Sequence, residues 1–186
     1  PWPEADGLVS DRGAQSLWVC GADCTPVLIA DPATGHVAAC HAGWRGVAAR
    51  ILPTAVEQLE ARGAHRADLV VALGPAISGA RYQVGDDVVS AIGASLGSTA
   101  AARTDLMKAG AVQDDPEPER CRFDLRAATV LQLTQAGLDP DQISRCPLCT
   151  AGEPELFHSW RRDQIKAVQW SGIVSQAEES AVSLSN

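Results

Sequence analysis

Residues 21–46 contain two short apolar segments joined by a tight turn, and this hairpin constrains the rest of the fold. Cys24 stands just before the first segment (27–30), and His41 directly follows the second (36–40). The sequence between the segments, Asp-Pro-Ala-Thr-Gly, has the residue types of a turn. Because a hairpin returns the chain to the end where it began, Cys24 and His41 are predicted to lie side by side.

A thiol and an imidazole that converge in this way can form half of a zinc site. The alternative is that both side chains only pack in the core or on the surface. The hexapeptide HAGWRG at 41–46 favours the site, because its glycines allow close backbone approach. Arg45 also stands near a predicted helix N-terminus, where phosphate is favoured. We predict Cys24 and His41 as metal-binding and catalytic residues, with Asp23 either orienting a ligand or only capping the turn.

Composition and charge narrow the class of protein. The chain has 186 residues with 46% hydrophobic and 20% charged residues, which is ordinary for a soluble domain. Its net charge of -8 argues against a nucleic-acid binder, and its apolar runs are too short to span a membrane. No signal peptide is visible, and free thiols in a reducing cytoplasm are expected for the six cysteines. Because the chain starts with Pro1 rather than Met, an N-terminal part is expected to be missing.

Strand and helix patterns alternate along the chain, which predicts one α/β domain over residues 1–176 with a mixed sheet. A flexible Ser-rich tail is expected for 177–186. The expected strands are 16–20, 27–30, 36–40, 68–73, 143–146 and 166–174. The expected helices are 47–62 with a kink or split at Pro53, 85–96, and 125–136 capped by Asp124. Residues 97–120 are expected to form a surface loop or a partial excursion from the domain.

Several motifs together resemble one known family. Ala22-Asp23-Cys24 followed by HAGWRG resembles the signature of the laccase-domain purine nucleoside phosphorylases, YfiH-like proteins that were earlier described as polyphenol oxidases. The resemblance continues in the same order through LGPAI at 73–77, YQVG at 82–85, FDL at 123–125, Cys149-Thr150 and FHSWRRD at 157–163. It implies a single three-layer α/β domain with a mixed β-sheet flanked by helices, the YfiH-like cysteine-hydrolase-type fold.

The resemblance also implies an activity and a cofactor. These are zinc-dependent phosphorolysis of adenosine, inosine, guanosine and methylthioadenosine to the base and ribose 1-phosphate, and deamination of adenosine. Cys24 and His41 match two of three zinc ligands of the family. The third, a histidine in a Gln-Val-His-Gly-type motif, precedes the segment that matches 5–10 and has no counterpart in this chain. Arg45 and Arg161 are candidate substrate contacts, because guanidinium suits phosphate.

Some alternatives stay open. Either Arg161 or Arg162 is expected to pair with a neighbouring carboxylate instead of a substrate. Cys146 and Cys149 have the spacing of a zinc knuckle, but without a second pair they are predicted to be structural thiols rather than a metal or redox pair. A copper polyphenol oxidase needs more histidines than the four present, so copper is the weaker expectation. A non-catalytic metal-binding interaction protein is the third possibility, and the oligomeric state is left open.

Overall fold

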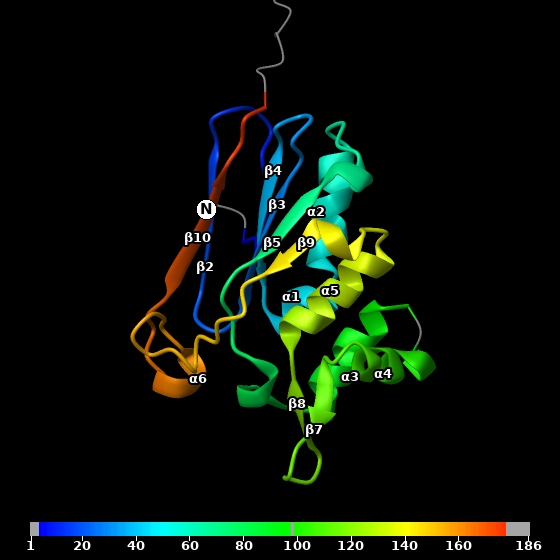
Figure 1. The fold of residues 1–186 in the computed structure, drawn as a ribbon, viewed down its shortest axis with the longest axis vertical. Coiled ribbons are helices and arrows are strands. Elements are labelled where there is room, and N and C mark those ends of the chain that lie inside the picture. The colour runs from blue at the N-terminus through cyan, green and yellow to red at the C-terminus, as the bar shows by residue number, and fades with distance from the viewer. Residues whose placement is uncertain (1–3, 98, 178–186) are drawn as a thin grey trace, which may run out of the picture.

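A five-stranded sheet forms the centre of the computed structural model, which describes residues 4–97 and 99–177 (Figure 1). The strand order is β1-β4-β3-β5-β9. All neighbours pair antiparallel except β5 and β9, which are parallel, so the predicted mixed sheet is confirmed. The strands are β1 (Gly7–Val9), β3 (Thr25–Ala30), β4 (Val37–Ala42), β5 (Val70–Leu73) and β9 (Ile143–Arg145).

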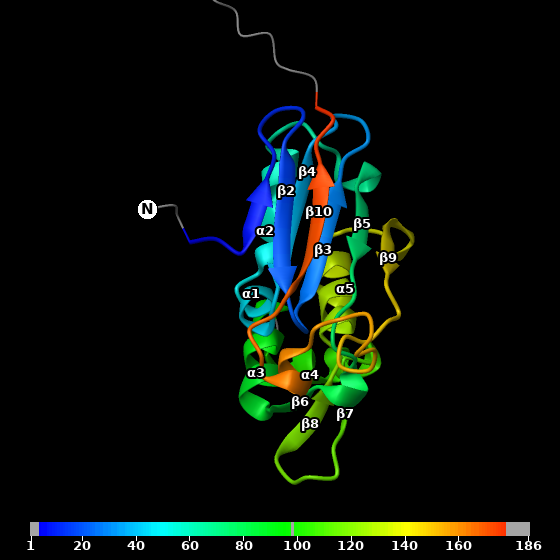
Figure 2. The same cartoon turned by 90° about the vertical axis from the view of Figure 1, so that its left-hand side faces the viewer.

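This sheet is covered on both faces, which makes the molecule three-layered (Figures 1 and 2). One face is covered by three helices, α1 (Trp44–Ala48), α2 (Ile51–Glu60) and α5 (Leu125–Gln135). A two-stranded ribbon of β2 (Ser16–Gly21) and β10 (Gln169–Val174) lies against the other face. The alternation of β3 follows from this arrangement, because Val27 and Ile29 join the helix-side core whereas Leu28 packs with the ribbon side. The predicted α/β class with a mixed sheet flanked by helices is therefore confirmed, and the ribbon forms the third layer.

The helical pattern after the hairpin is split into α1 (Trp44–Ala48) and α2 (Ile51–Glu60). The break lies at Arg50, whose φ of 61° is left-handed, and not at Pro53 itself. Pro53 is the third residue of α2, where the missing N–H has no intrahelical acceptor to lose. The predicted split is thus present but placed three residues earlier, because proline fits the first turn of a helix and not its interior.

A smaller unit lies at one end of the sheet (Figure 1). It consists of a three-stranded sheet in the order β6-β8-β7 and two helices. Its elements are β6 (Gln83–Gly85), α3 (Asp86–Ser95), α4 (Thr99–Lys108), β7 (Val112–Asp114) and β8 (Arg120–Phe123). The expectation of a surface loop over 97–120 is wrong, because α4 and β7 both form there. Ala102 and Leu106 of α4 are buried, and these two side chains anchor a helix in which half of the residues are polar.

Capping residues explain where α5 begins and ends. α5 (Leu125–Gln135) begins at Asp124, whose side chain accepts hydrogen bonds from the backbone N–H groups of Arg126 and Ala127, as the sequence predicted. Gly137 ends this region with a φ of 95°. The short helices are η1 (Arg66–Asp68), η2 (Gly79–Arg81), η3 (Pro140–Gln142) and α6 (Trp160–Asp163).

Two further predictions concern the C-terminal tail and membrane-spanning segments. The tail predicted for 177–186 falls outside the described residues from 178 on. Within the described residues, no helix combines the length and apolarity that crossing a bilayer requires.

Candidate functional site

The β3–β4 hairpin brings Cys24 and His41 together. His41 pairs with Pro26 across the two strands, and Cys24 immediately precedes β3, so both side chains lie at the same end of the hairpin. Strand alternation sends Cys40 into the helix-side core and leaves His41 half-buried on the opposite face. The side-by-side placement predicted from the sequence is therefore present.

The side chains of Cys24 and His41 both lie close to Gly43. A β-carbon at this position would lie 3.1 Å from Cys24 Sγ and 3.9 Å from His41 Cε1. Gly46, the other glycine of the hexapeptide, packs against the His41 carbonyl oxygen, 3.2 Å from the position of a β-carbon. Both glycines thus permit the close backbone approach that the motif predicted.

Burial and two carboxylates act on the ionisation of Cys24. Burial raises the pKa of Cys24 to about 11, and the carboxylates of Asp23 and Asp6 contribute to this rise. A nearby cation would reverse this effect and yield the thiolate. His41 Nδ1 lies 3.4 Å from Asp6 Oδ1, which is the carboxylate contact that commonly orients a metal-binding imidazole.

Asp23 connects the hairpin to the C-terminal third of the chain. Its carboxylate accepts hydrogen bonds from the Thr150 hydroxyl and from the backbone N–H of Arg161, each at 2.6 Å. The residue is buried and has a φ of 94°, a conformation that is uncommon outside glycine. Asp23 therefore does more than cap its own turn, because it fixes α6 next to the cysteine.

Arg161 contacts Tyr82, and the charges of Arg45 and Cys24 act on the same tyrosine. Arg45 stacks over the Trp44 ring at 4.3 Å. Arg161 lies 5.1 Å from the centre of the Tyr82 ring and donates a hydrogen bond to the Gln83 carbonyl oxygen. Burial and Cys24 raise the pKa of Tyr82, while Arg161 and Arg45 oppose that rise, so these groups share one electrostatic environment.

Arg45 reaches this environment from a helix of only five residues. So short a helix has a weak dipole, and the attraction for an anion rests mainly on the guanidinium itself. Arg162, in contrast, pairs with Asp163 at 2.7 Å and donates to the carbonyl oxygens of Thr150 and Phe157. The expectation that one of the two α6 arginines forms a local ion pair is confirmed for Arg162.

The other candidate ligands lie elsewhere. His36 hydrogen-bonds Ser10, whereas His65 and His158 are exposed outside the hairpin. All six cysteines, each within the described residues, are free thiols. Cys149 accepts a hydrogen bond from the backbone N–H of Ser78 at 3.2 Å, so it is held in its loop rather than paired with Cys146.

Three residues of the site have no role that the sequence alone assigns. Tyr82 belongs to the YQVG motif and Thr150 to Cys149-Thr150, so membership of a recurring motif is the signal that points to both. Asp6 lies in a segment that the sequence marks only as preceding the hairpin. Nothing in its local pattern indicates the contact with His41, because that contact depends on the pairing of β1 with β4.

The types of donor atom at this site suit zinc, but the described residues supply too few of them. A thiolate and an imidazole are usual zinc ligands, and Asp6 can orient the imidazole. Among residues 4–97 and 99–177, however, no group of three or more His, Cys, Asp or Glu side chains is arranged to hold a metal ion. The described residues thus do not by themselves assemble the three protein ligands that a catalytic zinc site needs.

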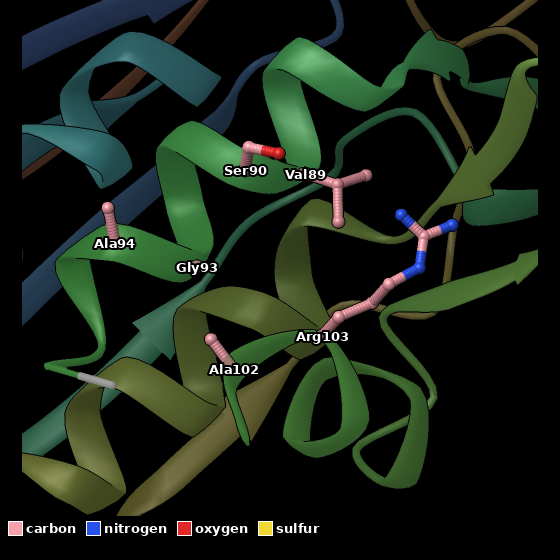
Figure 3. Close-up of a pocket in the computed structure, with 6 residues that line it drawn as sticks. All are labelled: Val89, Ser90, Gly93, Ala94, Ala102 and Arg103. Atoms are coloured by element: carbon pink, nitrogen blue, oxygen red, sulfur yellow. The ribbon is translucent and has the colours of Figure 1, made fainter. Parts of the chain in front are cut away.

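A cavity between α3 and α4 is separate from this site (Figure 3). Its volume is about 140 Å³, and Arg103 at its rim is already paired with Asp86 at 2.6 Å. It contains none of the predicted site residues and its walls are mostly small or apolar. The lining residues are Val89, Ser90, Gly93, Ala94, Ala102 and Arg103. Its chemistry does not support a catalytic role.

Comparison with curated proteins shows similarity along most of the chain. The chain is 46% identical to "Purine nucleoside phosphorylase slr1573" of Synechocystis, over 93% of this chain and 69% of the relative. It is 35% identical to "Purine nucleoside phosphorylase YlmD" of Bacillus subtilis, over 93% of this chain and 59% of the relative.

Solved structures agree with this similarity. YlmD from Geobacillus stearothermophilus superposes with a TM-score of 0.82 at 32% identity, over 94% of this chain and 62% of that chain. YfiH from Bacillus licheniformis gives a TM-score of 0.80 at 32% identity, over 92% and 61%. The chain therefore spans between 59% and 69% of the length of these four proteins.

The family model described as multi-copper polyphenol oxidoreductase laccase matches residues 1–175. This match covers the hairpin, the Asp23 contacts and α6, and it agrees with the motifs noted in the sequence. The chain belongs to the multi-copper polyphenol oxidoreductase laccase family, and the curated relatives described above are named purine nucleoside phosphorylases.

Proposed function

We propose that this chain carries the zinc-binding half-site and substrate contacts of a purine nucleoside phosphorylase that also deaminates adenosine. The observation that carries the proposal is the approach of Cys24 Sγ and His41 Cε1 to the same point beside Gly43. The names of the relatives support the nucleoside chemistry. Adenosine, inosine, guanosine and methylthioadenosine are the proposed substrates, with phosphate as the second reactant.

Cys24 and His41 would hold zinc together with a third donor from outside the described residues. When bound, zinc supplies Lewis acidity, which suits deamination of adenosine. Asp6 would keep the His41 ring oriented through its contact with Nδ1. Asp23 would keep Arg161 beside the thiol through its hydrogen bond to the Arg161 backbone.

Phosphorolysis requires an anion to be held against the sugar. An oxygen of hydrogen phosphate bonds to C1′ of ribose while the C1′–N9 bond to adenine breaks, and the proton that the phosphate loses ends on the departing base. The sugar carries positive charge in this transition state, so the attacking phosphate must be positioned by cations. Arg45 and Arg161 would supply this charge, and the proposal is supported by the effect of both guanidinium groups on Tyr82.

Two measurements test the proposal together. Metal analysis of the purified protein should give zinc near one per chain, and Cys24→Ser or His41→Ala should lose that zinc while keeping a native far-UV circular dichroism spectrum. Chromatography of adenosine incubations should show adenine only when phosphate is present, inosine without it, and neither after chelation. Retention of full zinc by either variant would contradict the assigned ligands.

Other outcomes of the same assay separate the alternatives. Copper-dependent oxidation of a phenol with adenosine left unchanged would support an oxidase, as the family description suggests. Stable zinc binding without turnover of nucleoside or phenol would support a metal-binding interaction protein. That second alternative has one structural observation in its favour, since the described residues supply only two donors.

A further inference from the structure

Four arginines converge on one cavity beside α6. The cavity has a volume of about 370 Å³ and opens to solvent. Two alanines complete its wall, so guanidinium groups dominate the chemistry of the lining. The lining residues are Ala80, Arg81, Arg122, Ala151, Arg161 and Arg162, and we call this cavity the arginine pocket.

Three of the guanidinium groups are held in place by contacts with the protein. Arg122 pairs with Asp115 at 2.5 Å and donates to the Ala80 carbonyl oxygen. Arg162 is bound by Asp163 and by two carbonyl oxygens. Arg161 is positioned by the Tyr82 ring and the Gln83 carbonyl oxygen. The pocket is therefore largely formed in advance and needs little ordering to bind a ligand.

Positive charge in the pocket exceeds the negative charge that contacts it. Asp115 and Asp163 pair with two of the four arginines, and within the described residues no carboxylate lies within 4.0 Å of the guanidinium of Arg81 or Arg161. This excess is local, because the chain as a whole carries a net charge of -8. Uncompensated like charges repel one another, and an anion bound among them would relieve that repulsion.

The pocket is connected to the Cys24 and His41 site by two residues. Asp23 binds the backbone of Arg161 and directly precedes Cys24. Tyr82 packs against Arg161 and lies near enough to Cys24 that the thiol affects its pKa. An anion in the arginine pocket would thus lie next to the chemistry proposed for the hairpin, with Tyr82 in contact with the pocket and close to the thiol.

We propose that the arginine pocket binds a phosphate dianion, supplied either as inorganic phosphate or as the phosphate group of a sugar phosphate. The planar fork of guanidinium donors matches phosphate oxygens in pairs, which a lysine ammonium does not. Binding of the anion stands on the four arginines alone. The role of the bound anion rests on the proposed function. In that reaction it is either the phosphate that is consumed or the sugar phosphate that is released.

Isothermal titration calorimetry with the full chain tests the proposal, using inorganic phosphate and ribose 1-phosphate as separate probes. Arg81→Gln removes an exposed guanidinium from the pocket rim, and we expect it to weaken phosphate binding by about tenfold or more. Arg81→Lys should fall between the native protein and Arg81→Gln. The matched control is Arg62→Gln, at a partly buried arginine just after α2 whose guanidinium contacts Gln58, and it should bind phosphate like the native protein.

The relative affinities of the two probes identify which anion the arginine pocket binds. Tighter binding of inorganic phosphate would identify the attacking reactant, and tighter binding of ribose 1-phosphate would identify the product. Absence of binding of both probes to the native chain, or equal weakening by Arg81→Gln and Arg62→Gln, would overturn the proposal. Phosphate binding that depends on Arg81 in a protein without nucleoside turnover would support this inference while overturning the proposed function.

Discussion

The carboxylate of Asp23 accepts a hydrogen bond of 2.6 Å from the backbone N–H of Arg161, 138 residues later in the chain. The same carboxylate binds the Thr150 hydroxyl, and Asp23 directly precedes Cys24. One buried side chain thus joins the proposed metal ligand to α6 and its arginines. The position of α6 and the position of the thiol therefore depend on the same carboxylate.

Removing the Asp23 carboxylate should loosen this junction. We expect Asp23→Ala to lower the free energy of unfolding by about 2 to 4 kcal/mol, because two hydrogen bonds to a charged acceptor are lost. Asp23→Asn should cost less, about 1 kcal/mol, because the amide oxygen can still accept from Arg161 and the amide nitrogen can donate to the Thr150 hydroxyl. Asparagine also tolerates positive φ better than alanine. Urea denaturation followed by circular dichroism measures both changes.

Hydrogen exchange gives a local measurement at the same junction. The Arg161 amide should exchange faster in Asp23→Ala than in the native protein, while the buried amides of β3 keep their protection under conditions where the fold is retained. Unchanged protection of the Arg161 amide in Asp23→Ala would show that the hydrogen bond does not hold α6.

A methyl group at position 43 should intrude on the proposed metal ligands. Gly43 has a φ of -75°, which alanine adopts freely, so the backbone should tolerate Gly43→Ala. Its β-carbon, however, would lie 3.1 Å from Cys24 Sγ and force the thiol to turn. We expect zinc affinity to fall by about 10- to 100-fold, the range seen when groups that orient ligands are altered. Competition with a chelating dye measures this affinity.

Gly21→Ala is the matched control for this substitution. Gly21 also lies beside Cys24 and His41, but its nearest neighbour to an added β-carbon is the Cys24 carbonyl oxygen at 3.5 Å, an ordinary contact. This variant should bind zinc like the native protein. Equal affinities of the two variants would argue that the space at Gly43 is not used by a metal ligand.

The hairpin can be predicted from sequence because its information is local. Turn residues between two apolar segments specify where the strands meet, and this alone places Cys24 beside His41. Asp124 at the start of α5 is equally local, since an aspartate before an apolar helical pattern is a common N-cap. Each of these features depends on residues that are neighbours in sequence.

Other features depend on packing between distant segments and leave no local pattern. α4 escapes prediction because half of its residues are polar and its sequence is only weakly amphipathic, although Ala102 and Leu106 are buried. The grouping of Arg81 and Arg122 with the arginines of α6 requires η2, β8 and α6 to meet, which no spacing in the sequence specifies. The contact between Asp6 and His41 likewise depends on the β1–β4 pairing.

Cys149 is expected to react at lower pH than the buried thiols. Burial alone would raise its pKa, but hydrogen bonds from Ser78 and from the backbone N–H groups of Gly152 and Ala151 outweigh burial and lower it. A lower pKa gives a larger thiolate fraction at a given pH, and thiolate is the reactive form. Burial instead raises the pKa of Cys40 to about 12, so that thiol should stay unreactive.

Alkylation with iodoacetamide between about pH 6 and 8, followed by peptide mass spectrometry, measures this order in the metal-free protein. Cys149 should be modified faster than Cys40 at every pH. Ser78→Pro removes both the backbone N–H and the hydroxyl donor of Ser78, and it should slow the modification of Cys149. Earlier modification of Cys40 than of Cys149 would contradict the arrangement of donors around the Cys149 sulfur.

Arg45 should matter more to phosphorolysis than to deamination. Phosphorolysis needs a cation to hold an anionic reactant against the sugar, whereas deamination uses water and has no anion to place. Arg45 stacks on Trp44 and acts on the same environment as Arg161, so its guanidinium can contribute to that hold. We expect Arg45→Ala to slow release of adenine by about 10- to 100-fold, as for loss of one charge-assisted contact, and to leave formation of inosine within about threefold. Chromatography of adenosine incubations with and without phosphate gives both rates from the same protein sample.

Arg12→Ala is the control for this prediction and should change neither rate. Arg12 is an exposed arginine in the loop before β2 and is paired with Asp11. Equal losses of both activities in Arg45→Ala would assign Arg45 to binding of the nucleoside, and unchanged rates would remove it from the site.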